Sequence, residues 1–183
     1  MNRMELFGES IFTSFRSYGE EVPCLELHVE RLYQGVNEYF CNSQLSMSAF
    51  LSYFELSDLR KKIEKNTYYR LTIYSQASAL PLVNLKSGLC DLNLELHSSK
   101  IISENEAEPL SLMTLSSPFS KDYVPLKSGS YFQHFLAKKK VMRKGFDDVL
   151  FTRDSEVLEL STSNIVFRQN EKQHYLIPQV QGA

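Results

Sequence analysis

The sequence predicts an α+β fold in which the sheets are largely antiparallel. Thr67–Gln76 and Asp91–His97 alternate apolar and polar residues with a period of two, which is typical of half-buried strands. From His28 the apolar residues instead fall at steps of three and four, as in an amphipathic helix: Val29, Leu32, Val36 and Tyr39. Because helices and strands do not alternate strictly along the chain, α+β is favoured over a parallel α/β fold.

The N-terminal elements follow from local pattern. Ser10–Arg16 mixes Ile and Phe with Thr and Ser, which predicts a strand. A turn at Tyr18–Glu21 then precedes a short strand predicted at Cys24–Leu27. Beyond the helix from His28, the helical pattern continues over Ser46–Lys65, where Ser57-Asp58 is expected to cap a new helical turn.

A polar stretch, Ser103–Pro109, reads SENEAEP and predicts a linker. We therefore expect two domains, residues 1–107 and 108–183. The second domain is expected to contain a strand, a helix closed by Gly145, a strand–turn–strand around Asp154-Ser155 and a last apolar stretch: Leu110–Leu115, Ser130–Lys144, Asp147–Thr152, Leu158–Phe167 and Tyr175–Ile177.

Composition excludes several classes of protein. The 183 residues carry 20 Lys and Arg against 22 Asp and Glu, and 43% are hydrophobic, so a real core is expected without a global attraction to nucleic acid or anionic membranes. Three distant cysteines predict neither a disulfide framework nor a zinc site. The N-terminus does not resemble a signal peptide, and no apolar run of about 18 residues could span a bilayer. A cytoplasmic location is the resulting expectation.

Common catalytic motifs are missing from the sequence. It has no Gly-rich phosphate loop, H-E-x-x-H, C-x-x-C or G-x-S-x-G motif, and its four histidines show no metal-ligand spacing. No metal site is therefore predicted. Lys138–Lys140, with Arg143 and Lys144, forms a basic run that a solvated helix face explains better than a nucleic-acid site.

One ordered set of motifs does point to chemistry. H-x-x-R-L at His28–Leu32 is followed by Lys127, by G-x-D-D-x-L at Gly145–Leu150 and by E-x-S-x-S-N-I-x-F at Glu159–Phe167. This order and spacing resembles the class IV, or fold-type IV, pyridoxal-phosphate enzymes, from Phe7 to Ala183. The resemblance implies a small N-terminal α/β domain with an antiparallel sheet and a C-terminal α/β barrel-like domain.

The resemblance also implies the site residues. Lys127 would bind pyridoxal phosphate covalently and later move protons, Arg31 would grip the phosphate with its fork of donors, and Glu159 would keep the pyridine nitrogen protonated. Ser163 and Asn164 match the family motif as further cofactor contacts. Taken alone, Lys127 could be a solvated lysine, Arg31 a helix-surface arginine paired with Glu30 or Glu38, and Glu159 a strand-edge charge that would need a cationic partner if half-buried.

Three functions stay open at this point. Phe12-Thr13-Ser14 resembles the F-T-T form seen in aminodeoxychorismate lyases, which release pyruvate and leave 4-aminobenzoate, more than the F-E-T form of transaminases. The first hypothesis is therefore such a lyase, and the second a branched-chain or D-amino-acid transaminase. The resemblance implies an amino substrate and a homodimer.

The third hypothesis comes from the two ends of the chain. Family members carry some further residues before a G-D-G turn, here Gly8-Glu9-Ser10, and a phosphate-binding segment after a T-P motif, here Ile177-Pro178. Relative to them the chain is short at both ends, and its C-terminal cofactor-binding domain is truncated. A non-catalytic relative is therefore the third hypothesis.

Overall fold

A computed structural model of the chain describes residues 2–41, 45–76, 91–101, 108–118, 127–168 and 175–176. The chain divides into two compact units, and the following paragraphs treat each by itself. The first contains Met1–Glu104 and Leu126–Ser130, and the second contains Asn105–Pro125 and Tyr131–Ala183. The segment with Lys127 thus belongs to the first unit, whereas a boundary between residues 107 and 108 would assign it to the second. Most of the expected linker Ser103–Pro109, namely residues 103–107, lies outside the described residues.

The first unit is built on a three-stranded antiparallel sheet. Strands β1 (Ser10–Arg16), β2 (Thr67–Ser75) and β3 (Leu92–Lys100) lie in the order β1-β2-β3. Their register runs without interruption, with Ile11 opposite Ile73 and Ile73 opposite Leu94. All three strands confirm the expectation from the period-two patterns and from the β-branched and aromatic residues of β1.

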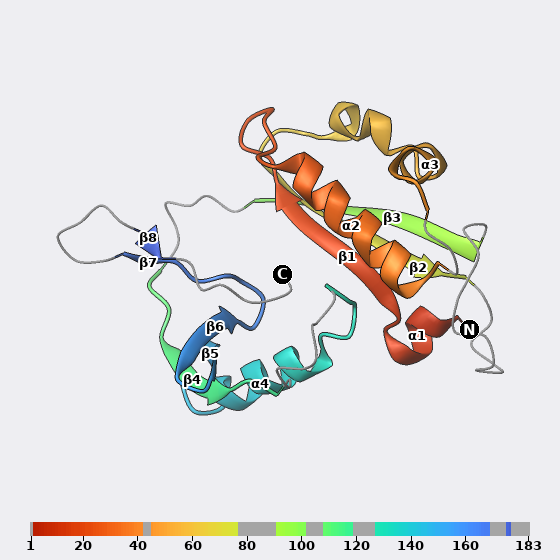
Figure 1. The fold of residues 1–183 in the computed structure, drawn as a ribbon. Helices are drawn as coiled ribbons and strands as arrows, with labels where there is room; N and C mark the ends of the chain where they lie inside the picture. Colours follow the sequence, from red (N-terminus) through yellow and green to blue (C-terminus); the bar gives the residue numbers. More distant parts are fainter. Residues whose placement is uncertain are drawn as a thin grey trace. The chain divides into compact units, whose positions relative to one another are not determined.

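Helix α2 (Leu25–Tyr39) runs along one face of this sheet (Figure 1). Its apolar stripe and the facing strand residues form one core, whose fully buried members include Leu32, Val36, Phe40, Phe50, Leu71 and Ile73. Burying one such leucine or isoleucine stabilises the fold by about 1.5–3 kcal/mol. The core therefore fixes α2 on β1, and with it the two residues of α2 that matter below, His28 and Arg31.

Two local predictions in this unit are wrong. Cys24–Leu27 is not a strand, because Cys24 has a left-handed backbone (φ 55°) and α2 already begins at Leu25. Leu25 lies in helical phase with Leu32 and is buried with it, so its apolar side chain belongs to the helix stripe.

The segment from Ser46 is helical but broken in two, into α3 (Met47–Tyr53) and the 3-10 helix η1 (Leu56–Lys62). Glu55 separates them with a φ of 53° and is the N-cap of η1. Ser57-Asp58 is therefore not the cap. One further short helix, α1 (Arg3–Phe7), precedes β1.

The second unit contains a sheet of order β4-β5-β6 with helix α4 packed against it (Figure 1). Strands β4 (Leu112–Ser116) and β5 (Asp148–Arg153) are parallel, because α4 (Phe132–Met142) lies between them in sequence and parallel neighbours need such a crossover. Gly145 follows α4 with a φ of 86°, which confirms the expected left-handed end.

Strand β6 (Glu156–Leu160) pairs with β5 antiparallel through a turn at Asp154 and Ser155. Both turn residues have positive φ, 47° and 70°, as a tight hairpin turn requires. The strand predicted over Leu158–Phe167 is only partly correct. It stops at Leu160, whose N–H donates to the Ser163 carbonyl at 2.8 Å, and that turn takes the chain out of the sheet.

A final pair, β7 (Phe167–Arg168) and β8 (Tyr175–Leu176), is antiparallel. The α+β class is confirmed, and the described strands of the second unit form open sheets rather than a closed barrel.

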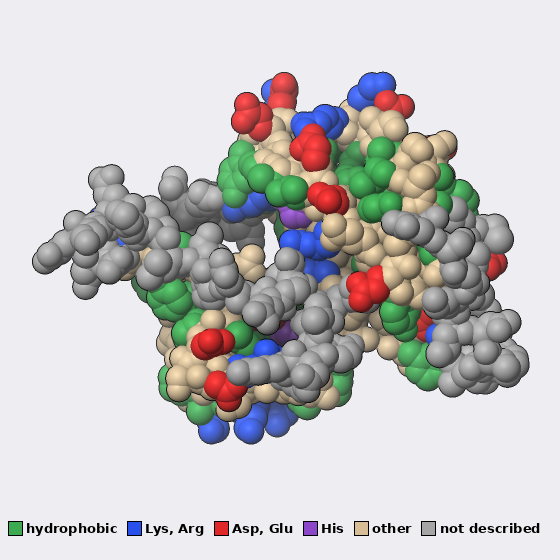
Figure 2. Space-filling model, in the orientation of Figure 1, with side chains coloured by type: hydrophobic (Ala, Val, Ile, Leu, Met, Phe, Trp, Pro, Cys, Tyr) green, Lys and Arg blue, Asp and Glu red, His purple; other side chains and the backbone are tan. Residues whose placement is uncertain are grey.

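The basic run lies on α4. Figure 2 shows Lys and Arg side chains gathered along the edge of the molecule where α4 lies, and Lys139, Lys140, Arg143 and Lys144 are exposed. Lys138 is the exception, since its Nζ lies 3.1 Å from Asp148 Oδ2. Within the described parts of the chain, no helix has the length and apolar content to cross a membrane.

Candidate active site

Lys127 is held against the free edge of β1. The Phe12 N–H donates to the Lys127 carbonyl at 2.7 Å, and the Gly129 N–H donates to the Ser10 carbonyl at 2.9 Å. Between these bonds, Ile11 and Ser128 form an antiparallel bridge. Residues 127–129 therefore act as a short extra strand, and the backbone of Lys127 is fixed in register with Phe12.

The Lys127 side chain lies over an aromatic ring. Its Nζ is 5.9 Å from the centroid of the Phe12 ring, and the Arg70 guanidinium carbon is 3.7 Å from the same centroid. Cations at such distances are attracted to the negative face of the ring. Phe12 thus gathers two positive charges, of which sequence reasoning identified only Lys127. The alternation of β2 placed Arg70 on the sheet face opposite Leu71 but gave no sign of a function.

His28 and Arg31 on α2 interact with the same part of the first unit as Lys127. The Thr13 Oγ1 and His28 Nδ1 lie 2.8 Å apart, and Thr13 is fully buried. The pKa of His28 is lowered from its ordinary value of 6.5, first by burial and then by the positive charges of Arg31 and Lys127. These two cations therefore lie close enough to His28 to act on its titration, and the imidazole between them is kept neutral at neutral pH.

Arg31 and Lys127, two of the residues that the sequence nominates, thus both act on His28 in the first unit. Arg31 is half-buried, and no ion pair joins it to Glu30 or Glu38, both of which the structure describes. A guanidinium and an amine of this kind, beside a neutral imidazole, suit an anionic group such as a phosphate.

Glu159 lies in the second unit, on β6. Its Oε1 is 3.5 Å from His134 Nε2 on α4, and the two side chains are 28% and 8% exposed. The Tyr131 ring stacks on His134 with centroids 4.6 Å apart. The half-buried carboxylate therefore lies beside an imidazole, on a histidine that sequence reasoning did not single out. Its position three residues after Tyr131 on α4 is a signal that helical spacing could have given.

Asp148 and Ser161 belong to the same unit, and both are buried. Burial by itself would raise the pKa of Asp148, but the Ser161 hydroxyl, the Val149 N–H and Lys138 together hold it below its ordinary value. Asp148 is thus a charged carboxylate engaged in structure. Ser163 and Asn164 follow at the turn after β6 and are exposed.

No cluster of three or more His, Cys, Asp or Glu side chains that could hold a metal ion occurs among the residues that the structure describes. The site residues are instead divided between the units, with Arg31 and Lys127 in the first and Glu159, Ser163 and Asn164 in the second.

Comparison with known proteins identifies the family. The family model for amino-transferase class IV matches residues 10–179, which include most of both units and every candidate site residue. The chain belongs to the aminotransferase class IV family. No curated protein matches the chain.

Solved structures agree on the fold of this class IV chain. A 4-amino-4-deoxychorismate lyase candidate from Legionella pneumophila has a TM-score of 0.67 at 18% identity, covering 92% of this chain and 62% of its own. A branched-chain aminotransferase from Thermoproteus uzoniensis has a TM-score of 0.67 at 15% identity, covering 92% and 59%. The PLP-bound form of a hypothetical aminotransferase from Mycobacterium tuberculosis has a TM-score of 0.64 at 16% identity, covering 92% and 61%.

These comparisons confirm the family and the fold-type IV architecture, and membership of the family implies pyridoxal phosphate as the cofactor. The chain spans about three fifths of the length of these solved structures. The residues present fit parts of that cofactor, because the first unit offers a lysine amine and an arginine guanidinium and the second offers a half-buried carboxylate.

Proposed function

We propose that this class IV chain binds pyridoxal phosphate through Lys127 and acts on a small amino substrate. The observation that carries the proposal is the grouping of Lys127 and Arg31 around His28, whose pKa both cations lower. Two cations beside one neutral imidazole favour the binding of an anionic group such as a phosphate.

Each site residue then has a defined task. Arg31 binds the phosphate with its forked donors, and Lys127 holds the cofactor and moves protons through Nζ. Glu159 on β6 keeps the ring nitrogen protonated, with Ser163 and Asn164 as polar contacts. When bound, the cofactor supplies an electron sink for the reacting substrate. Arg70, stacked on Phe12 beside Lys127, is placed to attract a substrate carboxylate.

Among reactions of the family, we propose one like that of aminodeoxychorismate lyase, which splits its substrate into pyruvate and 4-aminobenzoate. Thr13 supports this choice, because it stands in the motif position that resembles the lyase form. Its hydroxyl is fully buried against His28, so a carboxylate side chain there would have to be buried as well. Such a reaction would belong to folate biosynthesis.

The alternative is transamination, which the aminotransferases among the similar folds favour. A transaminase would require a keto acid to complete its turnover, whereas the lyase would not. Release of pyruvate from aminodeoxychorismate without a keto acid would therefore support the lyase, and strict dependence on a keto acid would support the transaminase.

The decisive experiment concerns the cofactor itself. Purified protein mixed with pyridoxal phosphate should develop a visible absorption band that borohydride removes, and peptide mapping should find the fixed cofactor on Lys127. Lys127→Ala should lose the band. Lys65→Ala is the matched control, because Lys65 lies in the same unit but is exposed and paired with Glu20 on the surface. Absence of a band from the wild type would favour the non-catalytic relative.

We also propose a homodimer in a cytoplasmic setting, as the family resemblance implies. Sedimentation at micromolar concentration, with and without pyridoxal phosphate, should give twice the 21.2 kDa mass of the chain. A monomer under both conditions would refute the dimer.

A further inference from the structure

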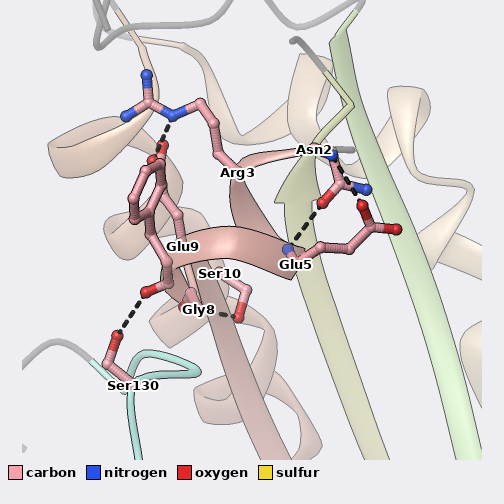
Figure 3. A network of polar contacts seen from close by, with 8 residues as sticks. Asn2, Arg3, Glu5, Gly8, Glu9, Ser10 and Ser130 are labelled. Carbon is pink, nitrogen blue, oxygen red and sulfur yellow. Dashed lines mark hydrogen bonds and ion pairs between the residues drawn. The ribbon is translucent and has the colours of Figure 1, made fainter. Parts of the chain in front are cut away.

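The N-terminal segment of the first unit contains a buried ion pair that the proposed chemistry does not use. Arg3 on α1 and Glu9, just before β1, pair through Arg3 Nε and Glu9 Oε2 (Figure 3). Their side chains are only 6% and 5% exposed. Burying an arginine and a glutamate together is costly, and each ion then depends on the other.

The buried Glu9 carboxylate relies on Arg3 for its compensating charge. Its second oxygen, Oε1, is buried without a hydrogen-bond partner among the described residues. A carboxylate of this kind cannot stay both charged and buried if its cation is removed, because an isolated buried charge costs several kcal/mol. Removing Arg3 should therefore drive the Glu9 side chain toward water and move the backbone on either side of it.

Helix α1 holds Arg3 in place for this role. With only five residues it has little stability of its own, but its N-terminus is closed by a capping box. The Glu5 N–H donates to Asn2 Oδ1 and the Asn2 N–H donates to Glu5 Oε2, both at 2.9 Å (Figure 3). The helix ends at Gly8, which has a left-handed φ of 69°.

The backbone on either side of Glu9 is hydrogen-bonded to residues 129–130, which belong to the same segment as Lys127. The Ser10 carbonyl accepts from the Gly129 N–H at 2.9 Å, and the Phe7 carbonyl accepts from Ser130 Oγ at 3.4 Å (Figure 3). Residues on both sides of Glu9 therefore bind residues 129–130, directly after Lys127. A shift at Glu9 is transmitted to Lys127 through two hydrogen bonds.

We propose that the buried Arg3–Glu9 pair positions Lys127, by fixing the backbone on either side of Glu9 to which residues 129–130 are bound. Arg3 and Glu9 are positioning residues and take no part in the chemistry. The inference rests on the proposed function only in so far as Lys127 is the residue that binds the cofactor.

The test compares Arg3→Met with Lys65→Met. The first removes the cation of the buried pair, and the second removes the cation of an exposed pair, Lys65–Glu20, whose side chains are 68% and 78% exposed. Two quantities are measured on each protein. One is amide hydrogen exchange at Phe12, Gly129 and, for reference, Ile73 in β2. The other is the rate at which pyridoxal phosphate and borohydride label Lys127.

Arg3→Met should speed exchange at Phe12 and Gly129 by at least about tenfold, the factor that corresponds to one net hydrogen bond, with Ile73 changing far less. Labelling of Lys127 should slow by a similar factor. Lys65→Met should change neither quantity. A pair with a purely structural role would instead raise exchange at all three amides together, and that result would overturn the proposal.

The double variant Arg3→Met/Glu9→Gln guards against a failure of Arg3→Met to fold. It removes both charges, so no charge is left buried and unpaired, and exchange and labelling should return to within about threefold of the wild type, as expected for a coupled pair. A double variant as impaired as Arg3→Met would refute the coupling. If the wild type is itself not labelled at Lys127, the proposed function fails, while the exchange measurements still decide whether the pair positions residues 127–130.

Discussion

Replacing Gly129 by alanine should disturb Lys127 more than it disturbs the fold as a whole. A Cβ added at Gly129 would lie 2.2 Å from Ser10 Oγ and 2.9 Å from the Gly8 carbonyl oxygen. The Ser10 side chain can rotate away, but the Gly8 oxygen is part of the backbone. To reach an ordinary contact of 3.4 Å, the two segments must separate by about 0.5 Å.

That separation acts directly on the bonds that hold Lys127. The Gly129–Ser10 and Phe12–Lys127 hydrogen bonds, 2.9 and 2.7 Å long, join the same two segments and would both lengthen. Overpacking of this size costs about 1–3 kcal/mol. Gly19→Ala is the matched control, because Gly19 has a φ of 59° and open space around it. Its left-handed strain costs a similar amount, about 1–2 kcal/mol, without touching residues 127–130.

The assay combines urea unfolding with the rate of Lys127 labelling by pyridoxal phosphate and borohydride. Both variants should lose comparable stability, but only Gly129→Ala should label several-fold more slowly, and Gly129→Ala/Ser10→Gly should recover part of the rate. Equal labelling rates in Gly129→Ala and Gly19→Ala would show that the contact at Ser10 and Gly8 does not place the lysine, and the reasoning would be wrong.

Three further predictions concern stability and its dependence on pH. Leu32→Ala should lower the free energy of unfolding by about 2–5 kcal/mol, because Leu32 is a fully buried residue of α2; a loss below 1 kcal/mol on urea titration would contradict the packing described. Because the pKa of His28 is lowered in the folded state, the unfolded chain binds the extra proton first, so stability should fall as pH drops below about 6.5, and His28→Asn should remove that part of the dependence. The pKa of Asp148 is lowered in the folded state, so its contribution to stability is present above its ordinary value of 3.8 and is lost as pH falls through the folded value. The melting temperature of Asp148→Asn should therefore change less with pH below pH 4 than that of the wild type, and equal dependence on pH would argue against a charged Asp148.

The sequence predicts the regular elements well where the pattern is long. Strand β2 and helix α2 each carry enough periodic residues for the side-chain period to identify them. The prediction fails where one backbone conformation determines where a helix begins, as at Cys24 and Glu55, which both adopt a left-handed φ without being glycine. It also overextends β6, because the apolar residues after Leu160 continue although a turn to Ser163 has ended the strand.

The candidate site also contains some residues that the sequence can predict and others that it cannot. Motif spacing nominates Lys127, Arg31 and Glu159 as candidate site residues, since the chemistry of the family demands particular residue types. It could not identify Arg70 or His134, because their contacts with Phe12 and Glu159 join residues more than twenty positions apart. Such non-local pairings depend on strand register and helix packing, which no local pattern encodes.

The placement of residues 126–130 with the first unit has a consequence for synthesis of the chain. During translation, the first 104 residues emerge before the strand that completes the edge of β1, and about 26 further residues must follow. At roughly 5–20 residues per second, β1 waits between about one and five seconds with the N–H and C=O groups of its outer edge unpaired. A nascent chain in that interval offers an open edge to other strands, so the yield of native protein should depend on translation speed between residues 104 and 130. Expressing the first unit alone as residues 1–104 would make that exposed state permanent.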